Sequence, residues 1–385
     1  MSGTAAGWGA LAGITVVDLS RIVAGPLCGQ LLGDNGAHVI KVEPPNGDDT
    51  RMWGNQLPDG SSSYFESINR NKQNISLDLR TEEDRATLWR ILESADVLIE
   101  NFKPGTMSGW GMDYERDLAP KLPQLIYCRI SGYGDDGPLG GLPGYDAALQ
   151  AYGGIMSVNG EPDRDPMRVG VPLVDTVTGI YAFSGILMAL IERARSGLGQ
   201  RVESTLFDTA LSLLIPHSGT WLTSGDVPPR TGAAHPWIAP YETFHTAQGL
   251  FFVAAANDRQ FVALCDVLGI PELAQDERFA LNTDRRANLE ALREVLAAKI
   301  AEWDPGELST VLLQRGVTAS PVNDTAQALS SPHAAHRGML VELDGYRTVG
   351  PPIKLSRTPA GVVKRPSAKN GDAAEIRAAL DGTSG

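Results

Sequence analysis

Asp175 is the residue whose type and surroundings most clearly suit a part in a chemical reaction. It lies in the segment 171–179 (VPLVDTVTG), directly before the almost uncharged stretch 180–191. The apolar spacing predicts a buried helix, and Pro172 suits its entry because the missing N–H is not needed there. The helix dipole stabilises an ionised carboxylate in the first turn by ~0.3–1 kcal/mol at an exposed site, whereas burial favours the neutral acid. A partly enclosed carboxylate can act as a nucleophile; the alternative is that Asp175 is only a cap or a dipole partner.

Four loops that follow expected strands are polar or rich in glycine. The strands are expected over 14–18, 37–43, 96–100 and 125–130, and each alternates with helical or turn segments. In open α/β sheets, ligands bind beyond the carboxyl ends of the strands. The shared position of the four loops therefore predicts one cleft.

The side chains in these loops suggest different ligand contacts. The loop 20–26 opens a helix and can offer backbone N–H groups to a phosphate or an amide, or it is simply a tight turn. Arg70 and Lys72 together could meet phosphates, or they form a solvated basic turn. Asn101 could hydrogen-bond the edge of a ring and Phe102 could stack on it, or the two could be a capping Asn and a packed Phe.

The elements that must position these residues indicate an α/β fold with two domains. Alternating strands and helices in the first part predict a Rossmann-like, parallel-sheet large domain, and a second pattern predicts a smaller α+β domain. We expect the large domain at 1–217, a linker at 218–240 that is rich in Gly, Pro, Ser and Thr, the small domain at 241–325, and a C-terminal segment 326–385 that returns to the large domain. The remaining expected elements are strands over 75–79, 202–204 and 250–254 and helices over 27–33, 81–95, 206–215, 258–268, 289–300 and 305–314.

Composition and missing motifs exclude several classes of function. The net charge of −13 argues against nucleic acid or an anionic membrane as a partner. The apolar run 180–191 is too short to span a membrane, and residues 1–13 do not have the pattern of a signal peptide. The first strand–loop–helix unit carries no GxGxxG, so a nicotinamide cofactor is disfavoured.

The cysteines and histidines favour a cytoplasmic protein without a metal. The three cysteines, Cys28, Cys128 and Cys265, are widely spaced and form no CxxC, which is typical of a reducing compartment. The closest histidines, His333 and His336, have no matching cysteine or HExxH pattern. The sequence therefore gives no support for a metal site.

An ordered set of short motifs resembles the class III CoA-transferases, the family that includes formyl-CoA transferase and relatives of carnitine CoA-transferase. The matching segments are VDLS (17–20), AGP (24–26), VIKVE (39–43), NRNK (69–72), ENFKPG (100–105), SGYG (131–134), GYD (144–146) and DTVTG (175–179). Each is weak alone, but together they follow the family's order over residues 14 to about 355.

The resemblance implies a role for each candidate residue. Asp175 falls on the catalytic aspartate, which would pass through aspartyl-anhydride and aspartyl-CoA thioester intermediates. The residues implied to bind a CoA thioester are Arg21, Ile22, Val23 and Ala24 over the thioester, Lys72 as a basic contact, the pair Asn101 and Phe102, and Tyr145. CoA thioester would be a substrate and no cofactor would be bound permanently. The partners implied are an acyl-CoA donor, a small carboxylic acid acceptor and a second copy of the chain in an interlocked homodimer, with 218–240 part of the crossing.

Three departures from the family pattern restrict the function. Val23 stands where formyl-CoA transferase has glutamine, which argues against formate and oxalate as substrates. The glycine-rich flap of that enzyme is matched by AAAND at 254–258. An α-methylacyl-CoA racemase is the first alternative, but Tyr145-Asp146 replaces the racemase His-Asp pair, and racemisation needs a base on each face of the α-carbon. A catalytically silent CoA-binding protein is the second alternative, and the intact Asp175 argues against it.

Overall fold

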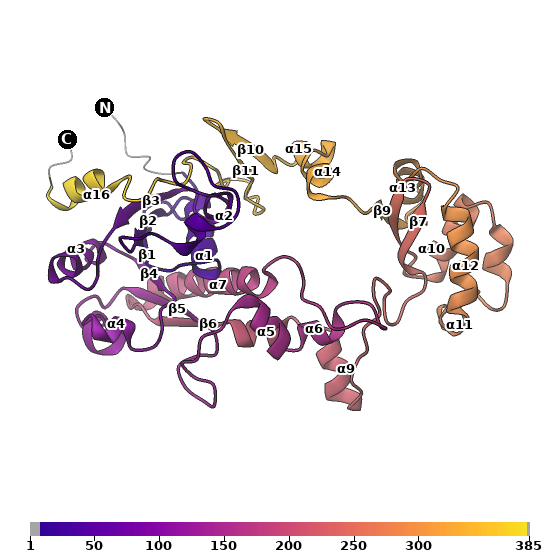
Figure 1. The fold of residues 1–385 in the computed structure, drawn as a ribbon, viewed down its shortest axis with the longest axis horizontal. Coiled ribbons are helices and arrows are strands. Elements are labelled where there is room, and N and C mark those ends of the chain that lie inside the picture. The colour runs from indigo at the N-terminus through magenta and orange to yellow at the C-terminus, as the bar shows by residue number, and fades with distance from the viewer. Residues whose placement is uncertain (1–7, 383–385) are drawn as a thin grey trace. The chain divides into compact units, whose positions relative to one another are not determined.

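The computed structural model describes residues 8–382, and the described chain divides into two compact units (Figure 1). The larger unit contains the residues up to Ile155, Arg168–Ser218 and the chain from Pro332 onward. The smaller unit contains Met156–Met167 and Gly219–Ser331. The predicted large domain, 1–217, includes 156–167. This segment instead pairs with the smaller unit, since Arg230 donates to the carbonyls of Glu161 and Arg164.

A six-stranded parallel sheet forms the centre of the larger unit. Its strands are β1 (Thr15–Asp18), β2 (His38–Glu43), β3 (Lys72–Ser76), β4 (Val97–Glu100), β5 (Ile126–Ser131) and β6 (Arg201–Thr205). Their order in the sheet is β3-β2-β1-β4-β5-β6, and every neighbouring pair is parallel. The strand order reverses between β1 and β4, which is the point where doubly wound sheets bind ligands. The expected α/β fold with a parallel sheet is confirmed.

Helices cover both faces of this sheet because successive strand residues point to opposite sides. Val16 packs on the face covered by α1 (Ala24–Asp34) and α7 (Leu173–Ser196). Val17 packs on the opposite face, with α3 (Glu82–Leu92) and the C-terminal helix α16 (Ala373–Leu380). The C-terminal segment thus completes the core of the larger unit.

Close contact between α1 and α7 brings their N-termini together. A Cβ atom at Gly179 would lie 2.6 Å from the carbonyl oxygen of Ala24, so only glycine fits there. Among the described residues α7 is long and apolar enough to cross a membrane by length and composition. Here one side of it packs against α1, β5 and β6, and 39% of its apolar window is buried.

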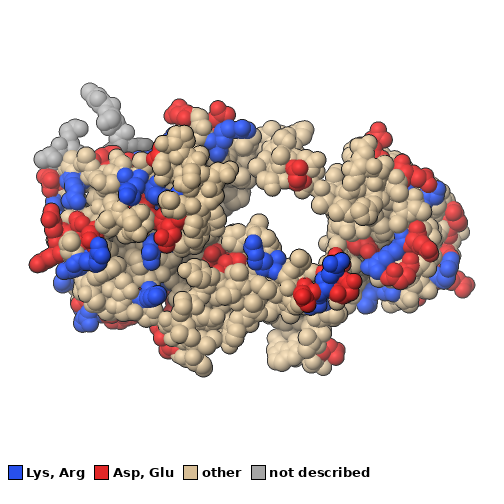
Figure 2. All heavy atoms as spheres, in the orientation of Figure 1, with Lys and Arg blue, Asp and Glu red and all other residues tan. Residues whose placement is uncertain are grey.

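The other elements of the larger unit are mostly short. They are α2 (Ser63–Ile68), α4 (Thr106–Gly109), α5 (Asp146–Tyr152), α6 (Ile155–Val158, at the unit boundary), α8 (Leu206–Ser212), α9 (His217–Ser224, which runs into the smaller unit), α15 (Pro332–His336) and the hairpin β10 (Leu340–Leu343) and β11 (Tyr346–Val349). On the face drawn in Figure 2, basic side chains lie interspersed with acidic ones.

The smaller unit packs helices against a three-stranded antiparallel sheet. Its elements are β7 (Tyr241–Thr246), β8 (Gly249–Ala254), α10 (Asp258–Val267), α11 (Asn282–Ala287), α12 (Leu289–Ile300), α13 (Pro305–Gln314), β9 (Thr318–Pro321) and α14 (Thr325–Leu329). Arg285 is fully buried in this unit. It donates to the carbonyls of Ala239 and Phe279 and pairs with Asp258 at 2.6 Å, so it fixes the start of α10.

The third strand begins at Lys72, three residues before the predicted start. Lys72, and Arg70 just before the strand, are buried with charged partners inside the unit: Lys72 Nζ lies 2.8 Å from Asp18 Oδ2, and Arg70 Nη2 lies 2.6 Å from Asp34 Oδ2. Burial lowers the pKa of Lys72 to about 8 although the charge of Asp18 opposes this shift. The predicted basic cluster at 69–73 is therefore an internal ion-pair network rather than an exposed patch.

This network generates a stability prediction. Replacing Lys72 by Met should destabilise the protein by about 3–5 kcal/mol, because it leaves the carboxylate of Asp18 buried without its partner. Urea unfolding measures the loss. The control is Arg90→Met on α3, whose exposed pair with Asp381 should contribute roughly 0–1 kcal/mol. Equal effects of the two substitutions would contradict the proposed importance of the buried pair.

Candidate active site

One cavity of about 190 Å³ opens in the larger unit at the carboxyl ends of β1, β4 and β5. The predicted site residues that line it are Arg21, Ile22, Val23, Ala24, Asn101, Phe102, Tyr145 and Asp175. Ser131, Gly132, Gly134 and the loop residues 141–144 complete the wall. The structure thus brings together segments that lie up to about 150 residues apart in the sequence, as expected for loops at one edge of a parallel sheet.

Asp175 lies in the first turn of α7, where Asp146 fixes the helix start. Oδ1 of Asp146 accepts hydrogen bonds from the backbone N–H groups of Val174 at 2.8 Å and of Asp175 at 3.2 Å. Gln150 donates to the other oxygen of Asp146 at 2.7 Å and accepts from the N–H of Val169 at 2.8 Å. The chain that leads into α7 is therefore tied to α5 by a buried polar network. Sequence analysis missed this role of Asp146 and Gln150, although Asp146 belongs to the GYD motif.

The Asp175 carboxyl group is half-buried and has an unusual acidity. Burial, and to a smaller extent the nearby carboxylate of Asp146, raises its pKa to about 7. A carboxylate that is costly to ionise keeps more of its basicity than an exposed aspartate, which suits a nucleophile that must act at neutral pH. Burial raises the pKa of Tyr64, and the charges of Asp175 and Asp146 act in the same direction, so this tyrosine lies near both carboxylates.

The loop that follows β1 is held in place by Asn101. The Asn101 amide accepts from the N–H of Arg21 at 2.9 Å and donates to the carbonyl of Arg21 at 2.8 Å. The next residue, Ile22, has φ of 74°. No side chain caps the start of α1 in the described structure, so the first N–H groups of this helix border the cavity without an intrahelical partner.

Phe102 connects this cavity to a second one of about 590 Å³. Its ring makes an edge contact with Trp110 at 5.1 Å between centroids, and the guanidinium of Arg21 lies 5.8 Å from its centroid. The second cavity lies at the ends of β1 to β4, and it shares Arg21, Phe102 and Lys103 with the first. An elongated ligand could therefore extend from Asp175 across Phe102 into the larger space.

The basic residues that line the second cavity do not include Lys72, the basic contact with CoA that the resemblance implies. Lys72 lines neither cavity, since its ammonium group is buried among Asp18, Asn69 and the carbonyl of Pro26. The position of its side chain does not support the predicted contact with CoA. Arg80 and Lys103 line the second cavity instead. Both follow the ends of expected strands, which is the signal that could have identified them.

A resident metal has no ligand set among residues 8–382, where no group of three His, Cys, Asp or Glu side chains could hold an ion. The three cysteines are unpaired and buried, and burial raises the pKa of Cys28, Cys128 and Cys265.

Comparison with known proteins identifies the class of enzyme. A profile of CoA-transferase family III matches residues 11–372. The chain is 42% identical to the succinate–glutarate CoA-transferase of Agrobacterium fabrum, with 96% of each chain covered. It is 41% identical to the acetyl-CoA:oxalate CoA-transferase of Acetobacter aceti, with 89% of this chain and 88% of the relative covered. A solved CAIB/BAIF family protein from Brucella suis has a TM-score of 0.90 at 44% identity and covers 97% of this chain and 100% of its own.

The chain belongs to CoA-transferase family III, and it is an enzyme of the class III CoA-transferase family. The resemblance drawn from the ordered sequence motifs is confirmed. CoA thioesters are the substrates of this class of enzyme.

The proximity of Asp146 and Asp175 generates a pH prediction. If the ionised Asp175 is required, kcat/KM should rise with pH and level off above its pKa of about 7. Asp146→Asn keeps an oxygen for the two N–H groups but removes the like charge. The pKa of Asp175 should then fall toward its ordinary value, and the rise in kcat/KM should move to lower pH.

The pH profile of kcat/KM checks this expectation. The control is Asp284→Asn, which changes an acidic residue in the first turn of α11 outside both cavities. The control should leave the midpoint unchanged. The same midpoint in wild type and Asp146→Asn would contradict the electrostatic role of Asp146.

Proposed function

We propose that this chain transfers CoA from an acyl-CoA donor to a small carboxylic acid by covalent catalysis at Asp175. The observation that carries the proposal is the half-buried carboxylate of Asp175, with its pKa raised to about 7, at the wall of a cavity that opens past Phe102 into a second, larger one. The loops predicted to bind CoA line that wall. Covalent catalysis is needed because a direct exchange between two stabilised anions, carboxylate and thiolate, is slow.

The proposed reaction has two symmetric halves. Asp175 attacks the thioester carbonyl and expels CoA thiolate, which leaves an aspartyl–acyl anhydride. The thiolate attacks the aspartyl carbonyl, so that the donor acid departs with one oxygen of Asp175 and an aspartyl-CoA thioester remains. The acceptor carboxylate attacks this thioester to give a second anhydride and free thiolate. The thiolate then attacks the acceptor carbonyl and releases the new acyl-CoA and a regenerated Asp175.

The oxyanion that forms at each carbonyl needs hydrogen-bond donors. The unpaired N–H groups at the start of α1, in the loop 22–24, border the same cavity as Asp175. Removing one donor that is fixed at the site of developing charge typically lowers kcat by roughly 10²–10³-fold. The segment 254–258 offers no such donors at Ala255 and Ala256, whose N–H groups donate to the carbonyl of Pro240 and to the side chain of Gln260.

The CoA moiety is proposed to lie across both cavities. Its thioester end would meet the loop 21–24 and Asp175, and its nucleotide end would reach Phe102, Arg80 and Lys103. Base–aromatic stacking is worth roughly 1–3 kcal/mol in nucleic-acid complexes, which is a reasonable scale for Phe102. Arg80 is largely exposed and donates two hydrogen bonds of 2.8 Å to Asp78; it would exchange this exposed pair for a phosphate.

The acceptor is proposed to be a short dicarboxylic acid. The relatives from Agrobacterium fabrum and Acetobacter aceti carry succinate, glutarate or oxalate in their names, and this supports the substrate class rather than one acid. The racemase alternative gains no support, since both oxygens of Asp146 accept hydrogen bonds from α5 and the start of α7. Tyr145 lines the cavity where the racemases carry their histidine.

We further propose an interlocked homodimer in the cytoplasm. Apolar side chains of α7 and α9 are exposed in the single chain, among them Ile180, Met188, Ile191, Trp221 and Leu222. Exposed apolar patches of this kind mark interaction surfaces, and a second copy would cover them. The unpaired, buried cysteines fit a reducing compartment.

A CoA-exchange screen tests the proposed function. Succinyl-CoA and acetyl-CoA are offered with a panel of mono- and dicarboxylic acids, and the new acyl-CoA is detected by chromatography. Exchange should occur with at least one dicarboxylic acid. Asp175→Ala and Asp175→Asn should both lose turnover while their affinity for CoA, measured by calorimetry, stays within about three-fold of wild type, because neither change touches the proposed nucleotide contacts.

Two results would contradict the proposal. One is full exchange activity in Asp175→Ala, which would place the nucleophile elsewhere. The other is epimerisation of a 2-methylacyl-CoA without any exchange, which would favour the racemase.

A further inference from the structure

Ile22 has a backbone conformation that its side chain disfavours. Its φ of 74° lies in the left-handed region, where a β-branched residue is a genuine outlier. The other described non-glycine residues with positive φ are Asn71, Asp344 and Asn370, whose short polar side chains tolerate that region better. Strained residues of this kind persist only where the surrounding structure determines them, and they concentrate at active sites. Ile22 lines the same cavity as Asp175.

The contacts on both sides of Ile22 explain how the strain is maintained. Before it, Asp18 accepts from the N–H of Ser20 at 3.0 Å, and Lys41 donates to the carbonyl of Ser20 at 2.8 Å. Arg21 is bound at both its N–H and its carbonyl by the single amide of Asn101. After it, Gly179 of α7 packs against the carbonyl of Ala24. The backbone is fixed both before and after Ile22, so Ile22 itself must take up the left-handed conformation that joins the two sides.

Asn101 is itself held in register by its neighbours. Glu100 is buried at the end of β4 and accepts from the N–H of Phe102 at 2.7 Å and from the hydroxyl of Tyr127 at 2.8 Å. The backbone on either side of Asn101 is therefore fixed to the sheet. The two hydrogen bonds to Arg21 use one donor and one acceptor of its amide, which is half of its capacity. Its main partner is the loop after β1 rather than the edge of a ligand ring.

We propose that Asn101 is a positioning residue that keeps Ile22 in the left-handed conformation and thereby aims the first N–H groups of α1 at the thioester oxygen. This inference rests on the proposed function, because it concerns the oxyanion formed when Asp175 attacks. Without the Arg21 contacts the strained turn relaxes toward ordinary backbone angles, and the N–H groups of Val23 and Ala24 leave their places. Asn101 then acts on the rate of reaction and only weakly on the binding of CoA.

Steady-state kinetics of Asn101→Ala separate these roles. With the acyl-CoA and acid that give exchange in wild type, kcat should fall about 100-fold, the usual effect of a misplacement of about 1 Å. The KM for acyl-CoA should change by less than about three-fold, because the interaction is made mainly in the transition state. A raised KM with an unchanged kcat would overturn the inference and make Asn101 a ligand contact.

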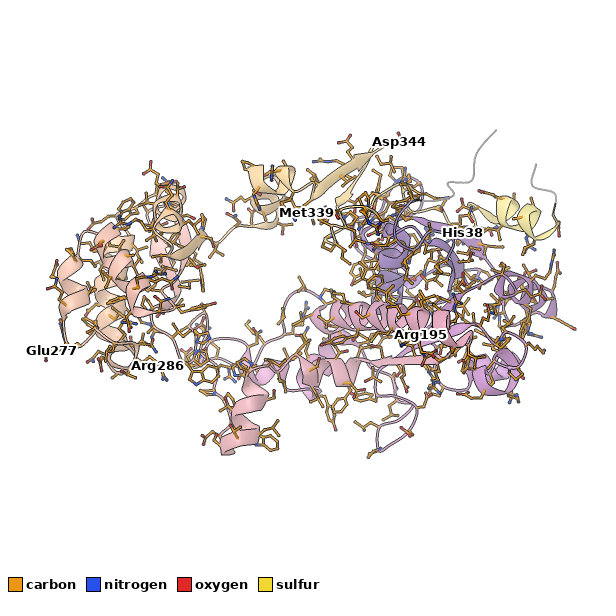
Figure 3. All side chains as sticks on the ribbon, turned by 180° about the vertical axis from the view of Figure 1, so that it is seen from behind. His38, Arg195, Glu277, Arg286, Met339 and Asp344 are labelled. Carbon is orange, nitrogen blue, oxygen red and sulfur yellow. The ribbon has the colours of Figure 1, made fainter. Side chains whose placement is uncertain are left out.

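A second substitution tests the strain itself. In Asn101→Ala/Ile22→Gly the glycine adopts positive φ without cost, so about ten-fold of the lost kcat should return, the rate equivalent of the penalty for a left-handed residue. The matched control is Asn101→Ala/Asp344→Gly. Asp344 has φ of 49° in the β10–β11 turn (Figure 3) and lines neither cavity, so this change should restore nothing.

These outcomes test the role of Asn101 and Ile22 separately from the proposed function. A double variant Asn101→Ala/Ile22→Gly that is as slow as Asn101→Ala or slower overturns the role of the strained turn, as does equal recovery in the Asp344 control. Thermal melting of each variant shows whether a lower kcat reflects loss of fold. Failure of the proposed function would appear differently, as absence of CoA exchange in wild type.

Discussion

The carboxylate of Asp146 at the N-terminus of α7 is the interaction on which the site depends. It accepts two hydrogen bonds from the first turn of the helix and so fixes the backbone of Asp175. The same charge makes the Asp175 carboxylate costlier to form, in addition to the effect of burial. One residue therefore positions Asp175, the proposed nucleophile, and also destabilises its ionised form, which is how an aspartate can keep a raised basicity at neutral pH.

The rest of the larger unit places the reaction partners around that carboxylate. The close contact of Gly179 with Ala24 brings the start of α1 beside the start of α7. The Asn101 amide then fixes the loop that leads into α1. Below these loops, buried ion pairs tie Asp18 at the end of β1 to Lys72 at the start of β3, and Glu43 at the end of β2 to Arg51 in the segment that follows it. Such pairs contribute little net stability but are costly to break, so the edge of the sheet on which the loops stand is rigid.

The fold was largely predictable from local patterns, whereas the partners of polar side chains were not. Apolar runs such as 14–18 and 96–100 define strands whatever lies around them, and the first turn before a long apolar helix identifies Asp175. The role of Lys72 depends on Asp18, which is 54 residues away, and that of Asn101 depends on Arg21, 80 residues away. Composition cannot distinguish a lysine paired inside a unit from one that faces a phosphate. The same reasoning explains why β3 begins earlier than predicted and why 156–167 packs with the smaller unit, since both depend on contacts distant in sequence.

The fate of the acid oxygens tests the central claim most directly. The enzyme is turned over with an acyl-CoA donor and an acceptor acid whose carboxylate carries heavy oxygen, then digested and analysed by mass spectrometry. In the second anhydride the bridging oxygen comes from the acceptor, and it stays on the enzyme when thiolate attacks the acceptor carbonyl. The peptide that contains Asp175 should therefore carry the heavy isotope, and the released donor acid should carry none until labelled enzyme turns over again. Formation of acyl-CoA product without label in that peptide, or with label in a different peptide, would contradict the account.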